Sequence, residues 1–278
     1  MKDVYFAYFI WSVAFVTIGA YVLRTWRLGR ARHYRTEADG GSVFLNKASM
    51  EFGYWIVGWA IDGLAALRIS PNLVTLLCLI PATIAGIAAG FGWFGLACVM
   101  ATLAAYGDIV DGLLARKLGT SSDAGEVLDA AVDRYGEFMF LAGLAVYYRT
   151  QWMVEVLVLA AILGSFMVSY TTAKAEAAQI KPPRGSMRRA ERAVYLLLAA
   201  GTTSVWKVFF GNSASYLLHE LPIILGITVV GVVSNVSVVQ RCALIMQELR
   251  ARAAKPEGAP PPLPAVIVSS PKDRAGAL

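Results

Sequence analysis

The sequence is poor in the residues that build disulfide frameworks, zinc sites and solvated surfaces. Only three cysteines, two histidines and 16% charged residues occur among its 278 positions. The cysteines, Cys78, Cys98 and Cys242, fall within apolar stretches and show no paired metal-binding or redox spacing. The histidines, His33 and His219, are far apart in the sequence. These shortages argue against a disulfide-stabilised domain and against a zinc site.

Apolar residues dominate what is present. Hydrophobic residues make up 57% of the chain, and the mean hydropathy is +0.57. This composition is typical of a polytopic membrane protein. The net charge is +6, and membrane proteins place such an excess of lysine and arginine in cytoplasmic loops. We therefore predict an all-α integral membrane protein with no nucleic-acid partner.

The first apolar run, residues 5–25, is long enough to cross a bilayer. The alternative is a cleaved signal peptide, but Asp3 weakens the basic start and no small-residue cleavage site precedes the arginines that follow. We interpret the run as a retained anchor. Residues 1–43 are thus predicted to form an N-terminal transmembrane anchor and a basic loop.

Residues 44–248 are predicted to form the main membrane domain. Residues 44–68 are amphipathic, as in a helix that lies in the membrane interface, with a poorly hydrophobic extra span as the alternative. Apolar spans follow at about 73–91, 94–115, 125–148, 153–173, 191–211 and 221–245. The predicted fold is a six-helix transmembrane core with an interfacial amphipathic helix and an extra N-terminal transmembrane helix. Residues 249–278 are Pro-rich and are expected to form a disordered cytoplasmic tail.

The distribution of basic residues predicts the orientation. Alternating spans place Lys2, Arg149 and Lys207 outside, and all the other lysines and arginines on the inner side or at inner helix ends. This bias puts the N-terminus outside and the C-terminus inside. We expect a multi-pass protein of the cell inner (cytoplasmic) membrane, with its polar site facing the cytoplasm.

Four carboxylates interrupt the apolar runs. Asp108 and Asp111 are three residues apart, and Asp129 and Asp133 are four apart. On two helices these spacings put each pair on one face, and the short polar turn at 117–123 directs both pairs into one space. Charged groups at membrane depth are costly and indicate a functional site. Oxygen ligands of this kind suit Mg²⁺, Mn²⁺ or Ca²⁺.

Small residues and one arginine accompany these carboxylates. Gly112, Ala115 and Gly125 either allow close helix packing or leave room for a flat ligand beside the metal. Arg116 is either a structural ion-pair partner or a phosphate ligand. The chemistry alone indicates a membrane metal site for a phosphorylated substrate, with a metal or anion transporter as the alternative. A transporter would need a second polar group on the outer side.

The stretch from Asp108 to Asp133 resembles the motif of the CDP-alcohol phosphotransferase (CDP-alcohol phosphatidyltransferase) family. Its pattern is D-x-x-D-G-x-x-A-R, eight residues, then G-x-x-x-D-x-x-x-D, and the resemblance covers about residues 44–245. It implies transfer of the phosphatidyl group of CDP-diacylglycerol to an alcohol, with release of CMP, by a homodimer. It implies that the four aspartates bind Mg²⁺ or Mn²⁺ and that Asp133 is also the general base. The positions that match the family's nucleotide contacts are Asn72, Thr75, Gly112, Ala115, Arg116 and Gly125.

Three later segments, 169–176, 189–192 and 238–241, resemble the branch of this family that makes phosphatidylinositol phosphate from inositol 1-phosphate. The resemblance implies that the acceptor, a soluble phosphorylated alcohol, is bound through its phosphate by Lys174, Arg189, Arg192 and Arg241. Thr172 stands where that branch usually has lysine, and Lys174 where it usually has arginine. These departures leave glycerol 3-phosphate, free inositol or an amino alcohol open as acceptors. The alternative for the basic residues of 174–192 is an ordinary cytoplasmic loop.

Overall fold

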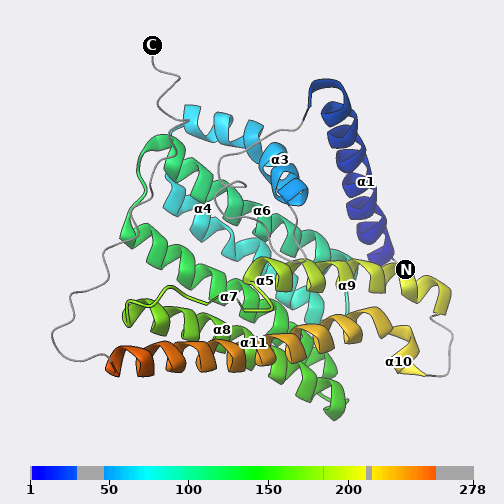
Figure 1. Cartoon of the computed structure of the whole chain (residues 1–278). Helices are drawn as coiled ribbons and strands as arrows, with labels where there is room; N and C mark the ends of the chain where they lie inside the picture. The colour runs from blue at the N-terminus through cyan, green and yellow to red at the C-terminus, as the bar shows by residue number, and fades with distance from the viewer. Residues whose placement is uncertain (1, 30–46, 184, 211–214, 255–278) are drawn as a thin grey trace.

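The computed structural model describes residues 2–29, 47–183, 185–210 and 215–254 (Figure 1). Within these ranges all regular secondary structure is helical, which confirms the predicted all-α fold class. The helices are α1 (Lys2–Leu28), α3 (Lys47–Ala66), α4 (Pro71–Leu77), α5 (Leu79–Gly90), α6 (Phe94–Leu118), α7 (Asp123–Tyr148), α8 (Trp152–Ala177), α9 (Arg189–Phe210), α10 (Tyr216–His219) and α11 (Leu221–Ala253).

Most long helices have the length and composition of membrane spans. Among the described residues these are α1, α4 with α5, α6, α8, α9 and α11. Helix α7 has 26 residues and is outside that group, although the sequence predicts a span there. Its charged residues, which continue as far as Glu137, account for this. Helix α3 has 20 residues and is also outside the group, in agreement with its amphipathic character.

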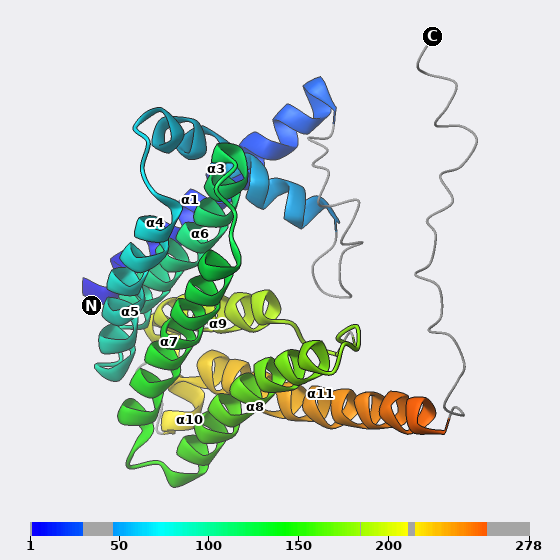
Figure 2. The same cartoon turned by 90° about the vertical axis from the view of Figure 1, so that its left-hand side faces the viewer.

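The core lies between α5, α6, α7, α8, α9 and α11. Buried side chains from all six helices form one apolar cluster, in which Phe94, Leu144, Val158 and Ile227 have no exposed surface. Helices α8 and α11 lie side by side, and α5 packs against both α6 and α7 (Figure 2). The carboxylate-bearing helices α6 and α7 are therefore each supported by α5 as well as by the short turn that joins them.

Two glycines bring the backbones of α5 and α7 into close contact. A Cβ atom on Gly86 would lie 2.4 Å from the Met139 carbonyl oxygen, and one on Gly143 would lie 2.0 Å from the Gly86 carbonyl oxygen. Any side chain at either position would push the helices apart. The small-residue spacing that begins at Gly86 thus serves packing within the chain, and it sets how closely α7 approaches its neighbours.

The turn between α6 and α7 is short and capped at both ends. Gly119 ends α6 in the left-handed conformation, with φ of 67°, and Thr120 N–H donates to the Ala115 carbonyl at 2.9 Å. This is the usual way for glycine to end a helix. The Ser122 hydroxyl oxygen then accepts from Gly125 N–H at 3.1 Å and caps the start of α7. The chain therefore reverses within a few residues and places two helical faces opposite each other.

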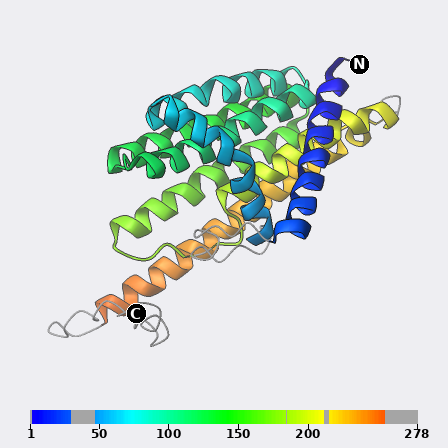
Figure 3. The ribbon, with the colours of Figure 1, turned by 90° about the horizontal axis from the view of Figure 1, so that it is seen from above.

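Helix α1 lies beside α6 and α9 at the edge of the bundle (Figure 3). The Asp3 carboxylate accepts from Gly95 N–H at 2.9 Å and Leu96 N–H at 3.0 Å, so it caps the start of α6. It also accepts from the Ser204 hydroxyl on α9 at 2.5 Å. Tyr21, near the other end of α1, packs against aromatic rings of α3. Helix α1 thus contacts α6 and α9 near one end and α3 near the other.

Parts of the predicted domain plan fall outside the described residues. These parts are 30–46, which holds most of the first basic loop, and 255–278, which holds most of the Pro-rich tail. Helix α11 itself continues to Ala253. The division at 43 and 248 stays a prediction.

Candidate active site

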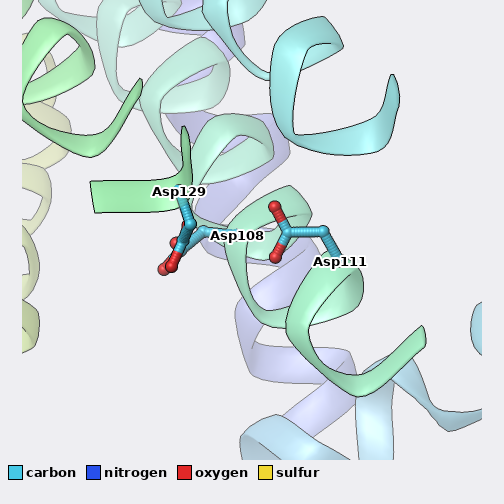
Figure 4. A group of neighbouring side chains, drawn as sticks. All are labelled: Asp108, Asp111 and Asp129. Atoms are coloured by element: carbon cyan, nitrogen blue, oxygen red, sulfur yellow. The ribbon is translucent and has the colours of Figure 1, made fainter. Parts of the chain in front are cut away.

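Three of the four predicted carboxylates converge between α6 and α7. Asp108, Asp111 and Asp129 each offer an oxygen atom that lies within 4.8 Å of the others (Figure 4). Asp111 is buried, with 4% of its surface exposed, and the other two are half-buried. Helical spacing on α6 and the short turn before α7 produce this grouping, as the sequence indicates.

The three carboxylates have the properties of a divalent-cation site. The Thr75 hydroxyl donates to Asp111 Oδ2 at 2.5 Å and fixes the orientation of that carboxylate. Within the described part of the chain, Asp129 Oδ1 is buried without a hydrogen-bond partner, which is costly for a carboxylate oxygen unless a cation or donor meets it. All the donors are hard oxygen atoms of the kind that Mg²⁺ and Mn²⁺ prefer. These residues fit a divalent metal ion.

Asp133 lies one turn further along α7 and has different neighbours. Its carboxylate is 9% exposed and contacts the side chain of Asp108. It forms an ion pair with Arg189 Nη1 at the start of α9, and Arg134 Nη1 is 3.8 Å from its Oδ2. Arg189 Nη1 also lies 3.4 Å from both oxygens of Asp108. The guanidinium therefore links Asp133 to the group of three.

An open polar pocket of about 470 Å³ lies on one side of the carboxylates. All the positions predicted to contact the nucleotide line it: Asn72, Thr75, Gly112, Ala115, Arg116 and Gly125. Asp111 and Asp129 belong to the same wall. A Cβ atom on Gly125 would lie 3.5 Å from Asn72 Oδ1, so glycine leaves space in the pocket there.

Sequence reasoning missed part of this pocket. The turn residues Thr120, Ser121 and Ser122 also line it, whereas the sequence analysis treats the segment as a connection only. The sequence signal for this part of the pocket was the run of hydroxyl side chains in the turn between the two helices. Hydroxyls and free helix-terminal N–H groups are common ligands of phosphate and sugar oxygens.

A second cavity, of about 110 Å³, lies on the other side of the carboxylates and is mainly apolar. Small and branched side chains from α5, α6, α7 and α9 line it: Ala82, Ala85, Ala101, Ala104, Ala105, Phe140, Ala193, Leu196 and Leu197. Asp108, Asp111, Asp129 and Asp133 all reach its wall. The carboxylates thus stand where a polar pocket meets an apolar one.

The four predicted acceptor-binding residues do not form one cluster. Arg189 contacts Asp108 and Asp133, as described. Arg192 has no exposed surface and binds both carboxylate oxygens of Glu137, at 2.6 and 3.0 Å. Sequence analysis missed Glu137, although it continues the four-residue spacing of Asp129 and Asp133 along α7.

The other two predicted acceptor residues lie on α8 and α11. Arg241 is 7% exposed, and its Nη1 donates to the Thr172 hydroxyl at 2.7 Å. Lys174 is exposed, and its Nζ lies 5.6 Å from the Tyr170 ring centroid. Arg192 Nη1 and Arg241 Nε are buried and have no hydrogen-bond partner among the residues that the structure describes. Each of these two arginines therefore has one buried N–H group that the described residues do not pair.

The sequence of this chain is similar to a known protein family and to its members. The family model described as CDP-alcohol phosphatidyltransferase matches residues 68–227. The phosphatidylinositol phosphate synthase of Streptomyces avermitilis is 33% identical over 218 residues, which cover 75% of this chain and 85% of that protein. The enzyme of the same name from Cutibacterium acnes is 31% identical over 199 residues, which cover 68% of this chain and 94% of that one.

Solved structures show the same fold. The crystal structure of Mycobacterium tuberculosis phosphatidylinositol phosphate synthase with CDP-DAG bound has a TM-score of 0.58 at 23% identity, covering 67% of this chain and 91% of that chain. The same enzyme in complex with manganese and citrate has a TM-score of 0.59 and covers 67% and 87%. The matched family model spans more than half of this chain, and the relatives match over most of their length. This chain therefore belongs to the CDP-alcohol phosphatidyltransferase family and is a transferase of phosphate-containing groups.

Proposed function

We propose that this protein transfers the phosphatidyl group of CDP-diacylglycerol to inositol 1-phosphate, producing phosphatidylinositol phosphate and CMP. The observation that carries the proposal is the position of the carboxylates between the polar pocket and the apolar cavity. CDP-diacylglycerol has a polar nucleotide at one end of its diphosphate and an apolar lipid at the other. The names of the curated relatives support the acceptor.

In this proposal the polar pocket holds the cytidine diphosphate. Gly112, Ala115 and Gly125 leave room for the nucleotide, and Arg116 pairs with its phosphates. Asn72 and Thr75 complete the wall, and Thr75 also orients Asp111. A Mg²⁺ or Mn²⁺ ion held by Asp108, Asp111 and Asp129 would neutralise the diphosphate and stabilise the charge on the departing CMP.

Asp133 takes the proton of the acceptor's attacking hydroxyl. The hydroxyl oxygen forms a bond to the lipid-side phosphorus of the diphosphate, and the bond from that phosphorus to the bridging oxygen breaks, so that CMP leaves with the electron pair. The carboxylate must be ionised and correctly oriented to act as base, and its ion pair with Arg189 favours both. The resemblance assigns Asp133 to the metal as well, and its contact with Asp108 is compatible with both roles.

The acceptor's phosphate binds Arg192 and Arg241 in this proposal. Their unpartnered buried N–H groups suit an anion with several acceptor oxygens. Lys174 is exposed and contributes as a cation at the entrance. Thr172 stands where the related branch usually has lysine. Its hydroxyl accepts a hydrogen bond from Arg241 and orients that side chain.

We also propose a homodimer in the inner membrane, with the carboxylates facing the cytoplasm. The positive-inside bias of the sequence supports this orientation. Contacts at the C-terminal end of α11 agree with it, because Arg252 donates to the carbonyl oxygens of Ala178 and Gln179, just after α8. The basic end of α11 thus lies beside the segment that leads to Arg189. Chemical cross-linking of the protein in native membranes tests the dimer.

The decisive experiment is an assay of CMP release with a panel of acceptors. The purified protein receives CDP-diacylglycerol, Mg²⁺ or Mn²⁺, and in turn inositol 1-phosphate, glycerol 3-phosphate, inositol and serine. We expect CMP and a phosphorylated lipid product with inositol 1-phosphate, and no release after chelation of the metal. Preference for another acceptor would correct the substrate, and the absence of CMP with every acceptor would contradict the proposed function.

A further inference from the structure

Two acidic side chains that do not belong to the motif line the polar pocket. Asp123 and Glu126, at the start of α7, form part of its wall, and both are exposed. Neither forms an ion pair with another of the described residues. Acidic residues in the first turn stabilise a helix, but this effect does not require them to face a pocket for an anionic nucleotide. Their position there suits a part of the ligand that carries no negative charge.

The charges of the pocket are separated along its length. At one end lie Asp111 and Asp129, where a metal ion would hold the diphosphate. Arg116 is directed to the same end, because its Nη1 and Nη2 atoms both lie 3.5 Å from the position of a Cβ atom on Gly112, the residue after Asp111. The other end is the turn at 120–122 with the start of α7. The cationic partners of a diphosphate are thus at one end, and the two additional acidic side chains are at the other.

Glu126 is placed to meet the part of the nucleotide that is furthest from the metal. It precedes Asp129 by three residues, so the two share a face of α7 about one turn apart. Side chains on a helix tilt toward its N-terminus, which directs that of Glu126 further toward the turn. Asp123 has a shorter side chain and does not share this spacing with Asp129. In a nucleotide whose diphosphate is held at Asp129, the base is the group that extends toward Glu126.

Cytosine offers a group that an acidic side chain recognises. Its exocyclic N4 amino group donates hydrogen bonds, which a carboxylate accepts. Uracil has a carbonyl oxygen at the same place, and a carboxylate and a carbonyl oxygen are both acceptors only. A site built to bind a donor group of its ligand rejects an analogue that lacks the group, because the polar side chain of the site is then left unpaired. A glutamate beside the base therefore separates the two pyrimidines.

We infer that Glu126 is a specificity-determining residue that accepts a hydrogen bond from the cytosine amino group and makes the pocket prefer cytidine to uridine nucleotides. The inference rests on the proposed function, which places a cytidine diphosphate in this pocket, and it adds the means by which the base is recognised. Gly112, Ala115 and Gly125 only leave space there. The hydroxyls of the turn both donate and accept, so they do not distinguish one pyrimidine from the other.

The test compares the binding of CMP and UMP to the full-length purified protein by isothermal titration calorimetry, with Mg²⁺ present and without lipid substrate. We expect the unaltered protein to bind CMP at least about tenfold more tightly than UMP, the equivalent of one hydrogen bond to a charged group. Glu126→Ala should lose most of this preference through weaker CMP binding, with little change for UMP. Glu126→Gln should bind both nucleotides, because a side-chain amide both donates and accepts. Glu248→Ala, which removes an exposed carboxylate of an ion pair on α11, is the matched control.

The possible outcomes separate this inference from the proposed function. Absence of CMP binding, equal affinity of the unaltered protein for CMP and UMP, or an unchanged preference in Glu126→Ala would overturn the inference. A loss of CMP and UMP affinity by the same factor would also overturn it, because the carboxylate would then bind the ribose that both nucleotides share. Thermal unfolding of each variant establishes that it is folded. Binding requires no acceptor, so a protein that prefers CMP in this way but releases none from CDP-diacylglycerol would contradict only the proposed function.

Discussion

At the scale of single residues, Asp129 and Asp133 differ although they lie one turn apart on α7. Asp129 shares a space with two further carboxylates, and one of its oxygens is buried with no hydrogen-bond partner in residues 2–29, 47–183, 185–210 and 215–254. Asp133 instead has a cationic partner from α9. Equal residue types at helical spacing therefore acquire different neighbours.

This difference predicts the behaviour of Asp133→Asn. We expect CMP release to fall by about 10²- to 10⁴-fold, the usual contribution of a general base, while Mn²⁺ binding is retained by the other three aspartates. Glu155→Gln, on α8 away from both pockets, is the control and should keep its activity. The measurements are initial rates of CMP release and a Mn²⁺ titration. Activity near that of the unaltered protein would remove Asp133 as the base.

Because Gly125 has no side chain, it is predicted to leave room for the nucleotide in the polar pocket. A valine there would extend toward Asn72 and Ser122, whose side-chain oxygens lie 3.5 and 3.3 Å from a Cβ atom at this position. We expect the KM for CDP-diacylglycerol to rise by about tenfold, equivalent to about 1.4 kcal/mol, with little loss of stability. Gly58→Val on α3 is the matched control, because a Cβ atom there meets no atom of the described residues within 4 Å. An unchanged KM in Gly125→Val would place the nucleotide elsewhere.

At the scale of helices, the start of α6 depends on a carboxylate from α1. Asp3 accepts two α6 N–H groups and the Ser204 hydroxyl, so it joins three helices at one point. Helix ends need such partners because their first N–H groups have none within the helix. The extra N-terminal helix is thus part of the packing of α6, whose other end bears Asp108 and Asp111.

Asp3→Ala should therefore destabilise the protein without changing its chemistry. We expect a loss of about 1–2 kcal/mol, the usual cost of removing a helix cap, seen as a lower midpoint of thermal unfolding in detergent. CMP release at a temperature where the variant is folded should be unchanged. Asp62→Asn is the control, since the exposed Asp62–Lys117 pair contributes less than about 1 kcal/mol. Equal midpoints for the two variants would contradict the role of Asp3.

At the scale of the whole molecule, a second polar group lies away from the carboxylates. Lys207 Nζ is 2.7 Å from Glu220 Oε1, and Tyr147 donates a hydrogen bond to the same carboxylate. These side chains bind one another and tie α7, α9 and the start of α11 together. The fully buried Leu144 on α7 and Phe94 at the start of α6 belong to the apolar core beside this group. The arrangement is that of a structural tie, and it does not favour the transporter alternative.

The proposed orientation predicts the behaviour of fused reporters. Green fluorescent protein joined after Leu278 should fluoresce in a bacterial host, and alkaline phosphatase at the same position should stay inactive, because the C-terminus is placed in the cytoplasm by the basic residues. Alkaline phosphatase joined before Met1, with the same linker, is the matched control and should be active. Active alkaline phosphatase at the C-terminus would reverse the orientation and place the carboxylates outside.

Sequence analysis anticipates those features that depend on local periodicity. Apolar runs predict the long helices, and helical spacing predicts that Asp108 and Asp111 share a face. The polar turn before Asp129 predicts that the two helices are close. It does not predict the position of Arg189, because 55 or more residues separate it from each carboxylate of the motif. Asp3 is a similar case, since its partners at Gly95 and Ser204 are far along the chain.

The sequence by itself determined an all-α membrane chain with a carboxylate motif and the family to which that motif belongs. Only the tertiary structure decided how the charges are divided: Asp108, Asp111 and Asp129 come together, Asp133 pairs with Arg189, and Arg192 pairs with Glu137. The physical reason is the distance along the chain over which a sequence pattern acts. Periodicity places side chains within about one turn of a helix, whereas the partner of a buried charge depends on which helices pack together.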